Sequence, residues 1–360
     1  MSKKLSKSIK GLILFLILSS LSIAAVLYFT VDSQTFDALT GIRPIYIIFC
    51  LVFWFIGIAA DAAGLLFLVK GSDEKIRIID SFKLSFARLF FNLITPFTFG
   101  GQPVVIYILK KIGVPSGKGS SIVVTRLLAL TFFSVLGAIF SLLFLGNRIT
   151  SQPTLQLTLI LSGIMVTALY AVALIGLLYP PFMKQIFKLL HSFFIKFRIG
   201  KKPDQFLESA FQEIHHARTS FQNYFKKHLS SFSGGIICAG ILHLMQVFIL
   251  MSVIQGLGIN IEFVEAFSLC SILFFLISFM PTPGSSGLGE GLFIILFAGK
   301  IPSYLIGITI ILWRIFFQYL TALIGAVISA RFFSNLIMND KTPSLNETGE
   351  NKTIENSTEL

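Results

Sequence analysis

The chain has 360 residues, of which 54% are hydrophobic and 13% are charged, with a mean hydropathy of +0.84 and a net charge of +12. A soluble domain carries about 25% charged residues, so this composition excludes a soluble globular protein and indicates several membrane helices. The apolar runs are too long for a membrane β-barrel, whose strands alternate over about 10 residues. In this setting the positive charge indicates loops on one side of a membrane and no nucleic-acid partner.

Six uninterrupted apolar stretches are each close to the roughly 20 residues that a membrane-spanning helix requires. The first of them exceeds the 7–15 residues of a signal-peptide core, so it is interpreted as an uncleaved helix. We therefore expect an all-α, polytopic integral membrane protein. The expected spans are 11–29, 45–69, 120–146, 155–179, 233–256 and 302–331.

Two further apolar stretches, 82–112 and 263–299, are interrupted by clusters of proline and glycine. The interruptions lie at 95–103 and 281–289. Each half is too short to cross a bilayer alone. Both stretches are therefore predicted to be re-entrant hairpins that enter and leave the membrane on one side.

The two interrupted stretches share a pattern of residues. In each, a Thr-Pro pair precedes paired or spaced glycines and a polar residue, and an arginine follows that polar residue by 24 positions. This spacing predicts that 45–146 and 233–331 are repeated units, related by inversion across the membrane. The matched residues are Thr95, Pro96, Gly100, Gly101, Gln102 and Arg126 in the first unit, and Thr282, Pro283, Gly287, Gly289, Glu290 and Arg314 in the second.

The distribution of positive charge predicts the orientation in the membrane. With the N-terminus in the cytoplasm, 23 of the 29 lysines and arginines fall in cytoplasmic segments and only three fall outside. The remaining three, Arg88, Arg126 and Arg314, lie within apolar stretches. The positive-inside rule thus places both termini in the cytoplasm of a multi-pass cell-membrane protein.

The membrane domain is expected to cover 1–334. Within it, 180–232 has aromatic residues at helical spacing beside lysines and an arginine, which predicts an amphipathic helix on an anionic membrane surface. The polar segment 335–360 is predicted to be a disordered cytoplasmic tail.

The glycines and arginines of the repeated pattern predict an anion site. A short helix that restarts after Gly101 and another after Gly289 would direct free backbone N–H groups toward the membrane interior. Arg126 and Arg314 would contact a phosphate with their guanidinium groups. The alternatives are that the glycines only permit tight turns, that Arg126 snorkels to the membrane surface, and that both arginines form structural ion pairs.

Three other polar residues lie at membrane depth. Glu290 could bind a cationic headgroup, relay a proton or neutralise Arg314. Gln102 occupies the matching position in the first unit. Asp61 has alanine neighbours on both sides, which predicts close packing of its helix and a hydrogen bond to another helix.

The sequence contains no arrangement of residues that predicts catalysis. Neither HExxH nor CxxC occurs, and no Walker A sequence is present. Gly284-Ser285-Ser286-Gly287 lacks the frame of a nucleophile loop. We therefore expect no metal and no cofactor, and any lipid movement to be facilitated or coupled to an ion.

The segments 92–103 and 281–290 resemble the two signatures of the lysylphosphatidylglycerol synthase transmembrane region, a flippase-like family also named UPF0104. The resemblance covers about 10–335 and implies movement of a modified lipid to the outer leaflet. In the longest relatives a soluble domain also transfers lysine from charged tRNA to phosphatidylglycerol, and this chain is expected to lack that domain. Where relatives often have glutamate, this chain has Gln102, so a carboxylate role there does not carry over.

The function expected from these observations is the binding and translocation of an anionic or aminoacylated phospholipid, or of an isoprenoid-phosphate lipid. Its partners would be membrane lipids, with a separate lipid-modifying enzyme as a further partner. One alternative is a phosphatidylglycerol lysyltransferase. Another is a carrier for a small water-soluble substrate, with a wide cavity closed to lipid.

Overall fold

The computed structural model describes residues 41–95, 97, 100–150, 153–178, 219 and 228–339, with the side chains of 147–150, 173–178 and 332–339 excepted. The expected span 11–29 lies outside these residues. So do Pro96, most of the amphipathic segment 180–232 and the tail from 340 onward.

The described chain is helical and contains no β-strand within those ranges, in agreement with the all-α prediction. The first unit and the helix after it consist of α3 (Pro44–Lys70), α4 (Ile78–Leu93), α5 (Gly101–Lys111), α6 (Ser116–Thr150) and α7 (Pro153–Leu178). The second unit consists of α10 (Leu229–Gly256), α11 (Phe263–Ile277), the 3-10 turn η2 (Pro283–Ser285), α12 (Leu288–Phe297), α13 (Ser303–Arg314), the π-helical turn η3 (Ile315–Tyr319) and α14 (Leu320–Asn339).

Five helices are long and apolar enough to cross a bilayer. They correspond to five of the six predicted spans, and the sixth prediction falls outside the described residues. The five are Pro44–Lys70, Ser116–Gly146, Pro153–Val172, Leu229–Gly256 and Ser303–Arg331.

Two features of the C-terminal helices differ from the sequence prediction. The last span contains the π turn η3, although the sequence of this turn includes no proline or glycine. The helix α14 continues to Asn339, so the first five residues of the predicted tail are helical.

Both interrupted stretches form helical hairpins, as predicted. The first chain break contains fewer residues than the predicted 95–103, because α5 begins at Gly101 and Pro103 lies within its first turn. A proline there removes an N–H group that has no partner inside the helix. The second break ends at Leu288, where α12 begins before Gly289.

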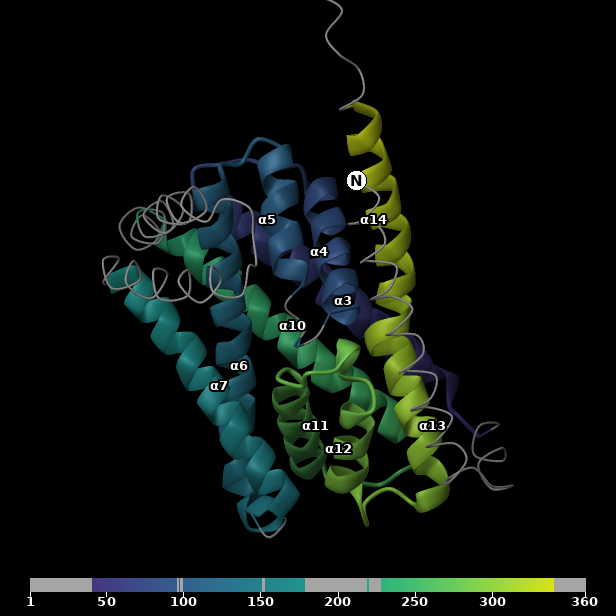
Figure 1. Ribbon diagram of the computed structural model, residues 1–360. Helices are drawn as coiled ribbons and strands as arrows, with labels where there is room; N and C mark the ends of the chain where they lie inside the picture. The colour runs from purple at the N-terminus through teal and green to yellow at the C-terminus, as the bar shows by residue number, and fades with distance from the viewer. Residues whose placement is uncertain are drawn as a thin grey trace, which may run out of the picture.

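The hairpins approach each other from opposite ends of the bundle. In Figure 1, α4 and α5 occupy the upper half and α11 and α12 the lower half. The turn η2 of the second hairpin contacts α4 of the first. The two chain breaks therefore meet in the middle of the protein.

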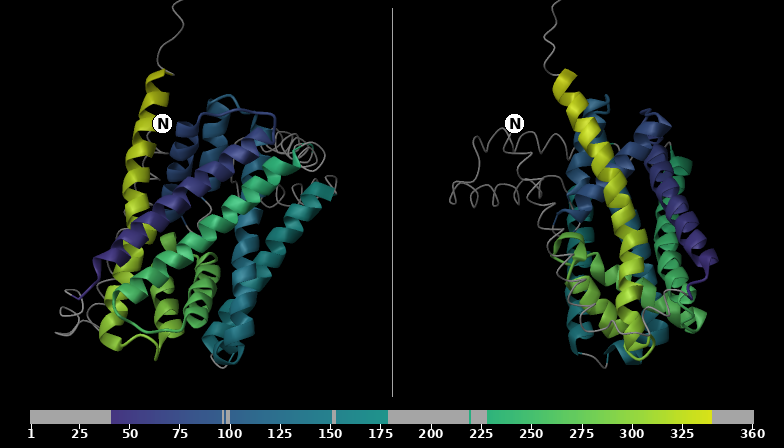
Figure 2. Two further views of the ribbon diagram at one scale, coloured as in Figure 1. Left: turned by 180° about the vertical axis from the view of Figure 1, so that it is seen from behind. Right: turned by 90° about the vertical axis from the view of Figure 1, so that its right-hand side faces the viewer.

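The long helices α3 and α10 form the back of this arrangement. They run side by side across one face in both views of Figure 2. A Cβ atom on Gly64 of α3 would lie 3.0 Å from Cβ of Cys238, and one on Gly235 would lie 2.8 Å from the Leu68 side chain. Small residues thus permit this close packing, as the alanines around Asp61 predicted.

Candidate functional site

Asp61, Arg88 and Arg126 form the first charge cluster, at the junction of α3, α4 and α6. Nη2 of Arg88 lies 2.8 Å from Oδ1 of Asp61. Arg126 is ion-paired with the same carboxylate oxygen. It also donates to the Asp61 carbonyl oxygen at 3.1 Å and lies 3.4 Å from the Ser85 hydroxyl. One carboxylate therefore serves two guanidinium groups.

The first charge cluster carries an excess positive charge in a buried position. Asp61 and Arg88 are each 3% exposed and Arg126 is 5% exposed. A charged side chain at membrane depth is costly unless it pairs or faces a cavity. No second acid pairs with either arginine among the described residues. The cluster is thus short of one negative charge.

Glu290, Arg314 and Gln318 form the second charge cluster, within the second unit. Nη2 of Arg314 lies 2.9 Å from Oε1 of Glu290, and the two residues are 0% and 1% exposed. Arg314 also donates to Oε1 of Gln318. One carboxylate here balances one guanidinium. This structural ion pair is the alternative to phosphate binding by Arg314 that the sequence analysis gave.

The second charge cluster also fixes the chain break of its hairpin. Arg314 donates to the carbonyl oxygens of Gly284 at 2.8 Å and Ser285 at 3.2 Å. Gln318 donates to the Gly284 carbonyl oxygen at 2.9 Å. The carboxylate of Glu290 accepts the Gly287 N–H at 2.7 Å, which caps α12. Arg314 and its partners thereby satisfy backbone groups that a helix would otherwise pair.

The helix starts predicted as anion sites are partly occupied by the protein itself. The N–H of Gly101 donates to Oδ1 of Asn92 at 2.9 Å, and that of Gly100 donates to Oγ1 of Thr95 at 2.9 Å. A Cβ atom on Gly101 would lie 2.2 Å from the Arg88 carbonyl oxygen, so glycine is needed for α5 to approach α4. These N–H groups secure the first hairpin.

A cavity of about 220 Å³ lies between the two hairpins. It is lined by residues of both breaks and of α3, α6, α10 and the π turn η3. Apolar and aromatic side chains make up most of its wall. Its polar lining residues are Arg88, Asn92, Gln102, Thr131, Ser134, His243, Gln246, Ser278, Ser285, Gln318 and Thr321.

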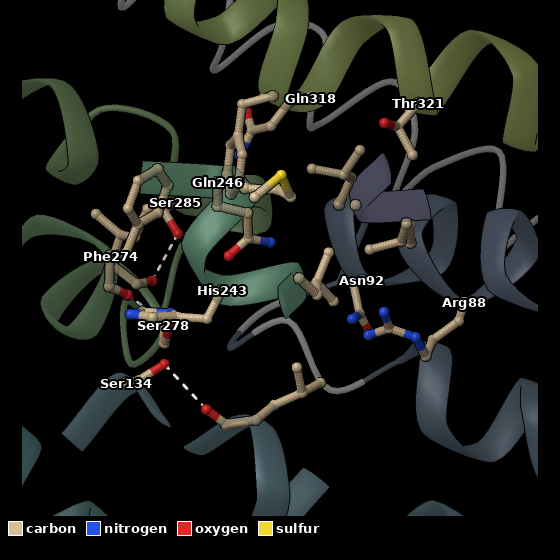
Figure 3. Close-up of a pocket in the computed structure, with 18 of the residues that line it drawn as sticks. Arg88, Asn92, Ser134, His243, Gln246, Phe274, Ser278, Ser285, Gln318 and Thr321 are labelled. Carbon is tan, nitrogen blue, oxygen red and sulfur yellow. Dashed lines mark hydrogen bonds between the residues drawn. The ribbon is translucent and has the colours of Figure 1, made fainter. Parts of the chain in front are cut away.

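Arg88 and Asn92 give this cavity a donor-rich side. They lie one turn apart on α4, and Figure 3 shows them together, with His243, Ser278 and Ser285 on the other side of the cavity. Because the Oδ1 atom of Asn92 accepts from Gly101, its amide nitrogen is the end left for a ligand. The buried Nε of Arg88 has no hydrogen-bond partner within the protein as described.

The predicted site residues divide into those that line the cavity and those that support it. Gln102 lines the cavity, and its buried Oε1 atom has no protein partner in the described structure. Arg126 and the second-unit residues Arg314 and Glu290 are not among the lining residues. The remaining predicted residues lie in the chain breaks or in the first turn of the helix that follows each break: Thr95, Gly100, Gly101, Thr282, Pro283, Gly287 and Gly289.

Sequence reasoning did not select Arg88, Asn92, His243 or Gln246 for the site. Arg88 was recognised as a charge within an apolar stretch, and its four-residue spacing to Asn92 places both on one helix face. That spacing, just before the first break, is the signal that could have identified them. The positions of His243 and Gln246 depend on how α10 packs.

Five helices long and apolar enough to span a bilayer, with two broken hairpins around a cavity, define a polytopic α-helical membrane protein. Residues 12–325 match the family described as the lysylphosphatidylglycerol synthase TM region, and the chain belongs to this family. It is also 25% identical over 264 residues to a UPF0104 membrane protein of Archaeoglobus fulgidus, a match that covers 70% of this chain and 76% of that relative.

Proposed function

We propose that the protein binds the headgroup of a membrane phospholipid, or of an isoprenoid-phosphate lipid, between the two hairpins and carries it from one leaflet to the other. The observation that carries this proposal is a cavity that has polar groups on a largely apolar wall and is lined by residues of both helix breaks, Phe97 and Ser285. Broken helices that meet at membrane depth are typical of transporter binding sites.

The size of the cavity supports a headgroup as the ligand. Its volume of about 220 Å³ exceeds the ~150 Å³ of a protein cavity that binds benzene. A diacyl phospholipid is several times larger than the cavity. The acyl chains would therefore stay in the bilayer while the headgroup crosses through the protein.

The composition of the cavity wall supports the same ligand. Arg88 and the Asn92 amide provide donors for phosphate oxygens, and a guanidinium group suits two oxygens at once. The aromatic residues Trp54 and Phe316 belong to the apolar part of the wall and would contact the carbon atoms of the headgroup. The family description names lysylphosphatidylglycerol, which makes a phospholipid the first ligand to test.

A reconstituted transport assay tests the proposal. The full chain is placed in phosphatidylcholine vesicles that contain traces of phosphatidylglycerol with a fluorescent acyl chain. Dithionite then bleaches the label in the outer leaflet. We expect bleaching to proceed beyond the outer half in protein-containing vesicles and to stop there in protein-free vesicles. Equal bleaching in the two preparations would refute lipid translocation.

A matched pair of substitutions on α6 tests whether the cavity is the route. Ser134 lines the cavity, and Ser134→Phe should fill part of it and slow lipid movement. Leu136 lies two residues away, does not line the cavity and is 43% exposed on the outer surface, so Leu136→Phe should have no effect. Equal rates in the two variants would place the route elsewhere.

A further inference from the structure

We infer that this cavity selects a headgroup with a phosphate anion and no ammonium group, in preference to an aminoacylated headgroup. This inference rests on the proposed function and narrows its substrate class. It departs from the lipid that the family description names, because it follows from the charges of this chain's own cavity.

Arg88 is the one charged residue among the described residues that line the cavity, and none of these residues is acidic. The two acids at membrane depth in the described structure are both engaged elsewhere. Asp61 is shared by two arginines, and Glu290 pairs with Arg314 and caps Gly287. A cationic headgroup would therefore meet no carboxylate in the cavity.

The first charge cluster supplies the attraction for an anion. Its two guanidinium groups and single carboxylate leave one positive charge without compensation, and Arg88 is the member of the cluster that lines the cavity. The Nε atom of Arg88 is buried and has no partner within the described protein. A phosphate in the cavity would supply both the missing charge and the missing acceptor.

An aminoacylated headgroup fits this arrangement poorly. A lysyl ester of phosphatidylglycerol carries two ammonium groups besides its phosphate, and at least one of them would share the cavity with Arg88. Like charges placed together in a binding site repel each other strongly. Aromatic rings such as Trp54 attract cations only weakly by comparison. The repulsion therefore outweighs the attraction.

A comparison of two lipids by the unmodified protein tests the inference. Phosphatidylglycerol and lysylphosphatidylglycerol carry the same fluorescent acyl chain, so only the headgroup differs. Each is added in trace amount to phosphatidylcholine vesicles that contain the full chain, and its rate of dithionite bleaching is corrected with protein-free vesicles. We expect phosphatidylglycerol to cross about tenfold faster or more, since each 1.4 kcal/mol of discrimination corresponds to tenfold.

A matched pair of substitutions checks that Arg88 causes the preference. Arg88→Gln should reduce the ratio of the two rates toward one. Arg77→Gln removes an arginine at the N-terminal end of the same helix, where the side chain is 78% exposed and pairs with Asp80, and should leave the ratio unchanged.

Each outcome decides between the claims. A faster rate for phosphatidylglycerol supports the inference. An equal or faster rate for the lysyl ester overturns the inference and leaves lipid translocation standing. If the protein moves neither lipid, both lipid translocation and the inference are refuted. Because the unmodified protein gives the main comparison, a variant that fails to fold does not prevent the decision.

Discussion

The two charge clusters, one in each unit, are balanced differently. In the second cluster one carboxylate, on Glu290, meets one guanidinium, on Arg314, and both are sealed inside the protein. In the first cluster one carboxylate, on Asp61, serves both Arg88 and Arg126. Each cluster has one member that lines the cavity, but that member is the cation Arg88 in the first cluster and the neutral Gln318 in the second.

We infer from this difference that Arg88 is positioned to bind an anion and that Arg314 has a structural role. Arg314 has its acid beside it and donates to Gln318 and to the backbone of the break. Arg88 shares its acid with Arg126 and lines the cavity, which Arg314 does not. The second cluster therefore holds its hairpin in shape, and the first is the cluster that a ligand would complete.

The largest expected effect comes from breaking the second cluster. Arg314→Leu leaves the Glu290 carboxylate buried without its partner and removes the donors to Gly284 and Ser285. Removal of one partner from a buried ion pair costs about 3–5 kcal/mol. We expect the free energy of unfolding to fall by about that amount, measured by reversible unfolding in mixed micelles.

Arg331 provides the control for that substitution, because it is an exposed arginine on α14. Arg331→Leu removes the same charge and should change the free energy of unfolding by less than about 0.5 kcal/mol. A similarly small loss in Arg314→Leu would contradict the structural role of the second cluster.

A somewhat smaller effect is expected when the first cluster loses its acid. Asp61→Asn leaves Arg88 and Arg126 adjacent without a counter-charge, although the amide oxygen still accepts a hydrogen bond. We expect a loss of about 3 kcal/mol. The double variant Asp61→Asn, Arg126→Gln should be more stable than Asp61→Asn alone, since it removes one repelling charge. Equal stability of the single and double variants would show that the charges do not interact.

A smaller effect again should follow from crowding the second cluster. A Cβ atom on Gly289 would lie 2.9 Å from Nη2 of Arg314, so Gly289→Ala forces the guanidinium group to move. We expect a loss of about 1–2 kcal/mol. Gly291 lies in the same helix with no atom within 4 Å of such a Cβ, so Gly291→Ala should not destabilise the protein. Thermal unfolding of the two variants side by side measures the difference.

The architecture could be predicted from the sequence because long apolar runs form spanning helices and Pro/Gly clusters break helices where they occur in the chain. Five of the predicted spans and both hairpins appear where hydropathy and helix breakers placed them. The π turn η3 was not predictable in the same way, since its residues Ile315–Tyr319 contain no helix breaker. Its presence depends on how the last helix packs around the cavity.

The choice of ion-pair partners could be predicted from sequence only in part. Glu290 and Arg314 carry the shared 24-residue spacing, and their pairing was one of the alternatives considered. In the first unit Gln102 stands where the second has its acid, so Arg126 pairs with Asp61 on a different helix. That partner, and the position of Arg88 at the cavity, follow from the packing of α3, α4 and α6, which no local pattern reveals.

The headgroup role of Arg88 is tested most directly by measuring both the free energy of unfolding and the lipid transport of Arg88→Gln. Asp61 would keep Arg126 as a balanced partner, so we expect the free energy of unfolding to change by about 1 kcal/mol or less. The dithionite assay should nevertheless show phosphatidylglycerol movement reduced about tenfold or more relative to the Arg77→Gln control, because a hydrogen bond to a charged group contributes about 1.5–3 kcal/mol. A folded Arg88→Gln protein that moves phosphatidylglycerol as fast as the control would contradict the assignment of the first charge cluster as the headgroup site.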